Sequence, residues 1–106
     1  PEEYIMTVLN DNGVSYEFQK RFDDLRGIRN RNLLRFDFFI PSLNTLIEYD
    51  GEFHYKKLHG ESCLKIQQQN DDLKTKYCEE HNINLIRIPY TTTKPEIKTL
   101  IENLIH

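Results

Sequence analysis

The sequence predicts a single α/β (α+β) domain: a small mixed β-sheet flanked by helices, in the order α-β-β-β-α-β-α. Apolar and polar residues alternate between residues 34 and 50, and a turn at 41–44 divides this stretch into two strands. A long polar segment without Gly or Pro covers residues 61–81, and an apolar stripe at helical spacing ends the chain. The 106 residues are enough for one domain with a modest core.

The chain is expected to begin with a short helix followed by a strand. Pro and two acids occupy the first turn of residues 1–9, which suits a helix N-terminus. Apolar residues then follow at helical spacing: Ile5, Val8 and Leu9. Residues 12–13 are Asn-Gly and end the helix. Residues 14–18 contain two aromatics and predict a strand, and a basic connection containing Gly27 leads on from it.

Residues 34–50 predict a β-hairpin with one apolar face and one face rich in carboxylates. The apolar set is Leu34, Phe36, Phe38 and Ile40 on the first strand, with Thr45, Ile47 and Tyr49 on the second. Pairing Ile40 with Thr45 aligns these sets, and Asp37 then shares the other face with Glu48 and Asp50. A slip of two residues would instead place Asp37 directly opposite Asp50. Because facing like charges are destabilising, the cluster indicates a bound cation, a shared proton or another functional constraint.

Three further elements complete the fold. Residues 61–81 predict an amphipathic helix, with Asn82 as a candidate cap at its end. Residues 83–88 predict a short buried strand that Pro89 stops, and a final helix begins near Pro95. The apolar stripe of that helix is Ile97, Leu100, Ile101, Leu104 and Ile105.

Composition and charge indicate a soluble globular protein of a cytoplasm-like compartment. No apolar run approaches the roughly 20 residues that cross a bilayer, and no signal-peptide pattern opens the chain. The start at Pro1 suggests a processed form or an excised domain of a longer protein. The net charge is -3, yet residues 20–35 carry six basic residues against two acidic ones. A basic segment beside carboxylates suits a polyanionic partner; a solvated, flexible loop is the alternative.

The carboxylates and a nearby histidine predict a site at one edge of the sheet. Asp37 lies in mid-strand, Glu48 and Asp50 lie on the neighbouring strand, and His54 follows four residues later. Mg²⁺ takes carboxylate oxygens and keeps several waters, so two or three acids and a substrate phosphate complete such a site. His54 has the pKa range to take a proton from an attacking water, although many such histidines are packing or loop residues.

Simpler explanations exist for two other charged groups. Asp71 precedes Lys74 by three residues on the long helix, so the two could form a local ion pair worth a few tenths of a kcal/mol. Glu2 and Glu3 could merely complement the dipole of the first helix.

A zinc site is a further alternative. Its ligands would come as two pairs at usable spacings, His59 with Cys63 and Cys78 with His81. On one continuous helix these pairs lie roughly 20 Å apart, too far for one ion, and only a break in the helix would unite them. The same separation rules out a disulfide between the two cysteines there.

Four segments, taken in order, carry a resemblance to a known family. They are Arg-Phe-Asp-Phe-Phe at 35–39, Ile-Glu-Tyr-Asp-Gly-Glu-Phe-His-Tyr at 47–55, Asn-Asp-Asp-Leu-Lys-Thr-Lys-Tyr-Cys at 70–78 and Leu-Ile-Arg-Ile-Pro-Tyr at 85–90. Together they resemble the phage homing endonucleases with the EDxHD active-site pattern. That group is similar to the very-short-patch repair nickases and belongs to the PD-(D/E)xK, restriction-endonuclease-like fold. The resemblance covers nearly the whole chain.

The resemblance implies four active-site residues. They are Glu2, with Glu3 as the fallback, then Asp37, His54 and Asp71. Asp50 falls where the wider superfamily has a lysine. His54, with Lys56 or Lys57, would therefore replace the usual lysine-assisted activation of water.

These inferences lead to the expectation of a Mg²⁺-dependent DNA endonuclease, with Mn²⁺ as a substitute. Asp37 is expected to be the first metal ligand, and Glu48 or Asp50 the second. His54 would activate the water, Asp71 would position His54 or the metal hydration shell, and Glu2 would complete the outer site. The residues expected to bind DNA are Lys20, Arg21, Arg29, Arg31, Arg35, Lys56 and Lys57.

The expected partner is double-stranded DNA in a phage-infected or bacterial cell, with the target sequence recognised by another domain. A homodimer is left open. A mismatch- or structure-specific nickase of the very-short-patch type is one alternative. A catalytically inactive nuclease-fold module that only binds DNA is the other, and it predicts salt-sensitive binding without cleavage.

Overall fold

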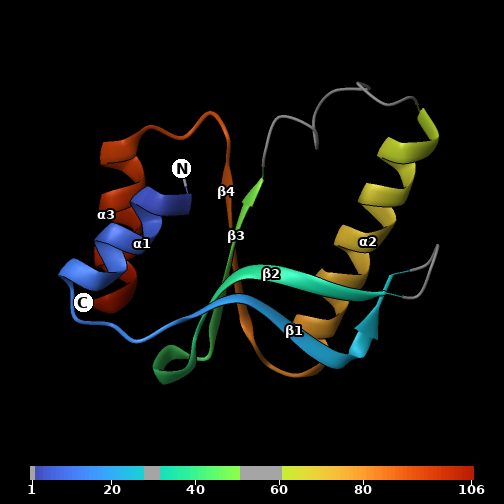
Figure 1. Ribbon diagram of the computed structural model, residues 1–106, viewed down its shortest axis with the longest axis horizontal. Coiled ribbons are helices and arrows are strands. Elements are labelled where there is room, and N and C mark those ends of the chain that lie inside the picture. The colour runs from blue at the N-terminus through green and yellow to red at the C-terminus, as the bar shows by residue number, and fades with distance from the viewer. Residues whose placement is uncertain (1, 28–31, 51–60) are drawn as a thin grey trace.

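The computed structural model describes residues 2–27, 32–50 and 61–106, and its elements follow the expected order α-β-β-β-α-β-α (Figure 1). The helices are α1 (Glu2–Asp11), α2 (Glu61–Glu80) and α3 (Lys94–Ile105). The strands are β1 (Glu17–Arg26), β2 (Leu33–Ile40), β3 (Thr45–Asp50) and β4 (Asn84–Pro89). They form one sheet in the order β1-β2-β3-β4, in which β1, β2 and β3 are antiparallel and β4 is parallel to β3. The expected fold class, a mixed sheet flanked by helices, is confirmed.

The hairpin of β2 and β3 has the expected register. Ile40 lies opposite Thr45 and Phe38 lies opposite Ile47, so the two-residue slip does not occur. A single 3-10 turn, Pro41–Leu43, joins the strands. It closes at Asn44, whose φ of 48° is left-handed and whose N–H donates to the Pro41 carbonyl at 3.2 Å. Asn adopts this conformation more readily than most residues, which explains why it ends the turn.

One face of the sheet packs against α1 and α3, which lie together at the left of Figure 1. The buried residues of this first core come from both helices and three strands: Ile5, Val8, Leu9, Phe38, Ile40, Ile47, Ile88, Ile97 and Ile101. The helical spacings read from the sequence are therefore the ones that bury these side chains.

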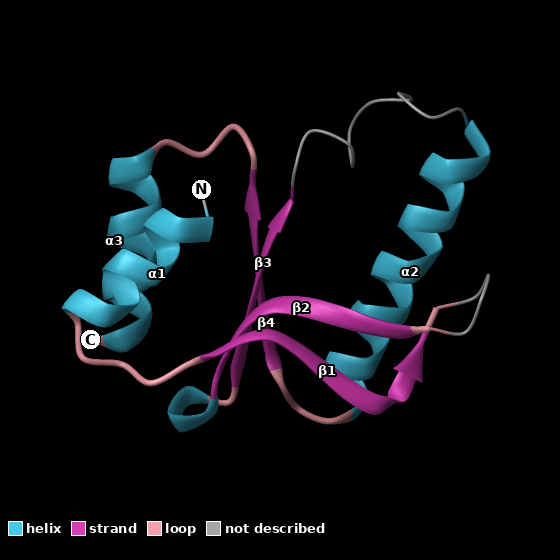
Figure 2. Cartoon of the chain, viewed as in Figure 1, coloured by secondary structure: helices cyan, strands magenta, loops and turns pink. Residues whose placement is uncertain are grey.

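The other face carries a second core, which corrects the expectation that Phe36 shares one apolar face with Phe38 and that the opposite face is occupied by carboxylates. Leu25, Phe36, Leu46 and Cys78 are buried there. Figure 2 shows why: the ribbon formed by β1 and β2 curves away from β3 and β4 towards α2. Because of this twist, Phe36 packs on the α2 side although Phe38 packs on the other. Of the expected carboxylates, Glu48 and Asp50 are buried, whereas Asp37 is half-buried.

Strand β1 also differs from the expectation of a strand at 14–18 followed by a basic loop. It runs from Glu17 to Arg26, and Arg21 lies opposite Arg35 of β2. The register shifts between Arg21 and Arg26, which marks a bulge. Lys20, Arg21 and Arg26 are thus on a paired strand at the edge of the sheet, a position where charged side chains are well tolerated.

Helix α2 is continuous and ends with a left-handed cap. Asn82 has a φ of 57°, and Ile83 donates its N–H to the Cys78 carbonyl at 2.9 Å. This is the hydrogen bond of a Schellman motif, so the expectation that Asn82 caps the helix is confirmed. Neither α2 nor any other helix in the described ranges is long and apolar enough to cross a bilayer.

Candidate functional site

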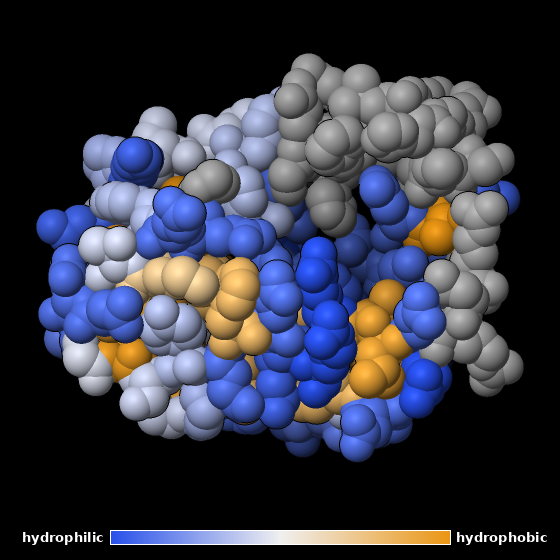
Figure 3. Space-filling model, in the orientation of Figure 1, coloured by the Kyte–Doolittle hydropathy of each residue, from blue (hydrophilic) through white to orange (hydrophobic). Residues whose placement is uncertain are grey.

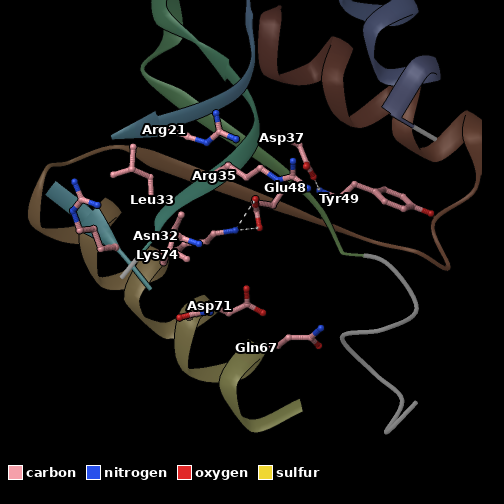
Figure 4. A pocket seen from close by; sticks show the side chains of 13 residues that line it. Arg21, Asn32, Leu33, Arg35, Asp37, Glu48, Tyr49, Gln67, Asp71 and Lys74 are labelled. Atoms are coloured by element: carbon pink, nitrogen blue, oxygen red, sulfur yellow. Dashed lines mark hydrogen bonds and ion pairs between the residues drawn. The ribbon is translucent and has the colours of Figure 1, made fainter. Parts of the chain in front are cut away.

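A cavity of about 780 Å³ opens between the ribbon of β1 and β2, the end of β3 and helix α2. Strongly hydrophilic side chains gather across this ribbon (Figure 3). The cavity is lined by four cationic side chains, Arg21, Arg26, Arg35 and Lys74, and by three carboxylates, Asp37, Glu48 and Asp71 (Figure 4). Anionic ligands and cations can both be held in such a mixed site.

Asp37 occupies the position where β2 separates from β3. The last residue pair of the ladder is Phe38 with Ile47, and beyond it the Tyr49 backbone N–H donates to Asp37 Oδ2 at 2.7 Å. The side chain therefore takes the place of a strand partner. This short, charge-assisted hydrogen bond fixes the Asp37 carboxylate at the wall of the cavity.

Glu2, at the start of α1, is brought beside Asp37. Burial raises the pKa of Glu2 above its ordinary value of 4.5, and the neighbouring Asp37 carboxylate adds to the shift, while Arg35 opposes it. Glu3 is exposed. Of the two acids that the sequence left open, Glu2 is the one that the fold places at the site.

Glu48 forms a buried ion pair with Lys74 of α2. The Lys74 ammonium lies 3.1 Å from each Glu48 carboxylate oxygen, and the two side chains are only 12% and 6% exposed, respectively. Burial raises the pKa of Glu48, and Lys74 opposes this shift. The simple expectation of a local ion pair between Asp71 and Lys74 misses this arrangement, because Lys74 reaches across to the sheet.

Arg87, in the middle of β4, connects the remaining carboxylates. Its Nη1 lies 3.6 Å from Asp50 Oδ1 and 3.7 Å from Asp71 Oδ1. Its Nη2 donates to the Asp71 backbone carbonyl at 3.0 Å and to Thr75 Oγ1 at 2.9 Å. Arg87 is not among the site residues expected from the sequence. The signal was present, since a charged side chain within the apolar segment 83–88 indicates a buried partner of opposite charge.

Asp37, Glu48 and Asp50 do not form a three-ligand cluster. Within residues 2–27, 32–50 and 61–106, no three carboxylate, imidazole or thiol side chains are arranged to hold a metal ion. Glu48 and Asp50 contact Lys74 and Arg87, and binding of a metal by Asp37 with one of these acids stays a prediction. Asp37 and Glu2 remain as two adjacent carboxylates. Two such groups fit Mg²⁺, which commonly binds one or two protein carboxylates together with waters and a phosphate.

The structure places the other expected residues as follows. Arg21 and Arg35 line the cavity, as does Asp71. The Lys20 ammonium instead lies over the aromatic rings of Phe22 and Phe39, away from the cavity lining. The predictions for Arg29, Arg31, His54, Lys56 and Lys57 lie outside the described residues, as does His59 of the zinc alternative.

Two observations disfavour the zinc alternative. Cys78 packs in the second core, and burial raises the pKa of its thiol, which opposes formation of the metal-binding thiolate. Helix α2 has no break, and His81 stacks on Tyr77 with its imidazole 4.0 Å from Asp24.

Comparison with known proteins assigns no family. No family model matches the chain, and no solved structure matches it. Uncharacterized protein 307L of Invertebrate iridescent virus 6 is 34% identical over 74 residues, which cover 66% of this chain and 36% of the relative. Uncharacterized protein 094L of Frog virus 3 is 37% identical over 82 residues, which cover 68% of this chain and 53% of the relative.

Uncharacterized protein 033L of Invertebrate iridescent virus 3 is 33% identical over 78 residues, covering 69% of this chain and 40% of the relative. The chain thus spans between about a third and a half of the length of these relatives. All three come from viruses named for invertebrate or frog hosts rather than from phages, which differs from the expected phage setting.

Proposed function

We propose that this chain is the catalytic domain of a metal-dependent DNA endonuclease that hydrolyses phosphodiester bonds with an activated water. The observation that carries the proposal is the convergence of carboxylates from separate elements beside a basic ribbon. Glu2 comes from α1 and Asp37 from β2, and both lie next to the cavity that Arg21 and Arg35 line. A polyanion backbone held by the arginines would present a phosphate to the two acids.

Glu2 and Asp37 are the residues that would hold Mg²⁺, or Mn²⁺ in its place. The donor chemistry fits, because burial and the Asp37 carboxylate together raise the pKa of Glu2, and a cation would favour the charged form of both acids. When bound, the metal polarises the phosphoryl group and lowers the pKa of a coordinated water.

The remaining side chains of the cavity bind and orient the substrate. The exposed Arg21 and Arg35 neutralise DNA phosphates. Glu48 fixes the Lys74 ammonium at the cavity wall. From there the ammonium attracts the phosphate that is to be cleaved next to Glu2 and Asp37. Arg87 fixes Asp71, whose carboxylate accepts a hydrogen bond from water and orients it. Activation of that water by His54 rests on the family resemblance.

The proposed activity belongs to one part of a larger protein, in which another domain recognises the target sequence. The length of the relatives supports this arrangement. Their viral origin supports an infected cell as the setting, in place of a phage-infected or bacterial one.

Cleavage of supercoiled plasmid by the 106-residue chain tests the proposal. We expect nicked or linear products with Mg²⁺ or Mn²⁺ and intact plasmid in EDTA. Asp37→Asn and Glu2→Gln should each slow cleavage by about tenfold or more, since loss of even about 1.4 kcal/mol of transition-state stabilisation has that effect. Glu3→Gln and Asp72→Asn are matched controls, because both acids are exposed neighbours on the same helices as Glu2 and Asp71, respectively. Undiminished cutting by Asp37→Asn would refute the proposal.

The same assay separates the two alternatives. A nickase would leave nicked circles without linear plasmid and would prefer mismatched duplexes. A binding-only module would retard DNA in a salt-dependent manner and cut none.

A further inference from the structure

Strand β1 changes the side on which its aromatic residues pack between Phe18 and Phe22. The two residues are four apart, so a regular strand would place both side chains on the same face. The centre of the Phe18 ring instead lies 5.4 Å from that of Phe38, which belongs to the first core. The centre of the Phe22 ring lies 5.9 Å from that of Phe36 and 5.0 Å from that of Tyr77, on the side of the second core. The strand therefore turns over between these two aromatic residues.

Gln19 is the residue at which β1 turns over. Its φ is 56°, in the left-handed region, whereas φ in an antiparallel strand is near -140°. No other residue of Glu17–Arg26 has a positive φ. Residues other than glycine are strained in this conformation, and such strain persists only where the surrounding structure compensates for it. Strained residues of this kind are concentrated at functional sites, so the neighbours of Gln19 are of interest.

The residue opposite Gln19 on β2 is Asp37. Phe18 pairs with Phe38, so in this antiparallel register the next position along the ribbon brings Gln19 opposite Asp37. Strand β2 turns over at the same level, because Phe38 packs in the first core and Phe36 packs in the second. The left-handed residue and the carboxylate thus belong to one distortion of the ribbon.

This distortion coincides with the point at which the Asp37 carboxylate enters the cavity. Strands β2 and β3 pair as far as Phe38 with Ile47, and beyond that pair the Tyr49 N–H donates to Asp37 Oδ2 at 2.7 Å. Because this N–H points towards β2, its acceptor in a continued ladder would be a backbone carbonyl of β2. The turn in the ribbon replaces that carbonyl with a side chain, and the same side chain lines the cavity beside Glu2.

We propose that Gln19 is a positioning residue, whose left-handed backbone holds the Asp37 carboxylate at the wall of the cavity. Gln19 itself does not line the cavity, so it acts through Asp37. The inference deepens the proposed function and rests on it for the consequence in cleavage. The backbone conformation is the property that matters, and the amide side chain is not. Replacements of Gln19 should therefore rank by how readily they adopt a positive φ.

Gln19→Gly and Gln19→Val test the backbone conformation. Glycine adopts a left-handed φ without strain, whereas a β-branched residue resists it. We expect Gln19→Gly to melt at or above the wild-type temperature and Gln19→Val to melt about 5 °C or more below it. Glu17→Gly and Glu17→Val are matched controls, because Glu17 is an exposed residue of the same strand in regular register. At that position the order should invert, since valine suits a strand better than glycine does.

The amide proton of Tyr49 reports the position of Asp37 in EDTA, without metal or DNA. A short hydrogen bond to a carboxylate moves this resonance downfield in the NMR spectrum, and Asp37→Ala gives its position when the bond is lost. We expect Gln19→Val to move the resonance towards that position and Gln19→Gly to leave it near the wild-type one. Overall stability does not set this chemical shift, so a role of Gln19 in folding alone would not move it.

Plasmid cleavage with Mg²⁺ then measures the consequence for the reaction. Gln19→Val should lower kcat about tenfold and leave KM little changed, because the arginines that hold the DNA are retained. Gln19→Gly should restore the wild-type rate.

An unmoved Tyr49 resonance in Gln19→Val would overturn the inference. An equal displacement in Gln19→Gly would also overturn it, because the side chain would then be responsible. If Gln19→Val does not fold, the two glycine variants decide: equal losses of melting temperature in Gln19→Gly and Glu17→Gly would overturn it. The NMR and melting measurements need no cleavage, so failure of the wild-type chain to cut plasmid refutes the proposed nuclease alone, whereas an unmoved resonance refutes the positioning role alone.

Discussion

Lys74→Met isolates the contribution of the buried Lys74–Glu48 ion pair. Methionine keeps the length and apolar character of the lysine stem and removes the charge. Glu48, whose side chain is 6% exposed, is then left without the ammonium that lies 3.1 Å from both of its oxygens. Removing one partner of a buried pair typically costs about 3–5 kcal/mol, because the remaining charge stays desolvated.

The structure limits this cost at neutral pH. Glu48 can escape by taking up a proton. Protonating a carboxyl group at pH 7, which is 2.5 pH units above its ordinary pKa of 4.5, costs about 3.4 kcal/mol, at about 1.36 kcal/mol per unit. This cost is the upper limit of the penalty from the charge of Glu48. Arg87 Nη1, 4.0 Å from Glu48, still compensates part of the charge. We therefore expect a loss of about 2–3 kcal/mol in the free energy of unfolding at pH 7, or roughly 10–20 °C in melting temperature.

The loss must depend on pH. In the variant, the folded-state pKa of Glu48 lies further above its value in the unfolded chain. The penalty is then fully present above the folded-state pKa, shrinks as pH falls through it, and is absent below about 4.5. At low pH, a loss of about 0.5–1 kcal/mol in the free energy of unfolding should remain, because the variant also lacks the Lys74 ammonium that lies 5.3 Å from the centre of the Phe36 ring.

Urea denaturation followed by circular dichroism at pH 7, 6 and 5 measures these losses. Lys76→Met is the control, since Lys76 is 73% exposed and its pair with Glu80 should contribute less than about 0.5 kcal/mol. Adding Glu48→Gln to Lys74→Met should recover part of the loss at pH 7. A loss of the same size at pH 5 and pH 7 would show that packing, not charge, explains the effect.

Two further predictions concern α1 and α3. Glu2→Gln should stabilise the fold at pH 7 by less than about 1 kcal/mol, because it removes a partly buried charge and its partly screened repulsion from Asp37, and the gain should vanish below about pH 4.5, where Glu2 is protonated in both the folded and the unfolded chain. Urea denaturation at both pH values checks this, and a gain from the exposed Glu3→Gln would contradict the reasoning. Thr93→Ala should lower stability by about 1 kcal/mol, because Thr93 caps α3 by accepting the N–H of its third residue. Thermal unfolding against the exposed Thr91→Ala measures that cost, and equal melting temperatures would rule out the cap.

The register of the central hairpin could be predicted from sequence because it depends on neighbouring strands. Ile40 and Thr45 are joined by a short turn, and a shift of one residue would expose every apolar side chain of both strands. The apolar residues of α1 and α3 could also be predicted, because each helix buries a single stripe of side chains at helical spacing. The second core could not be predicted, because Phe36 and Leu46 pack with Leu73, Tyr77 and Cys78 of α2, which are more than twenty residues away in the chain.

The partners of the carboxylates could not be predicted for a related reason. A local i,i+3 pair explains Asp71 and Lys74 adequately when only the sequence is considered. The fold instead directs Lys74 to Glu48, 26 residues away, and Arg87 to Asp71, 16 residues away. These pairings depend on the approach of α2 to β3 and β4, which local periodicity does not specify.

The counterions divide the acids of this domain by role. Glu48, Asp50 and Asp71 contact Lys74 or Arg87, and these contacts fasten α2 to the sheet. Glu2 and Asp37 differ in their neighbours: burial and then the adjacent Asp37 carboxylate raise the pKa of Glu2, and Arg35 opposes the shift. Burial also raises the pKa of Glu48, but there the nearest charged group is the Lys74 ammonium. The proposed metal would bind at this pair of carboxylates, Glu2 and Asp37, where its charge would offset their repulsion. Asp37 would then both hold the metal and accept the Tyr49 N–H that fixes its position, while Lys74 and Asp71 act from the wall of the same cavity.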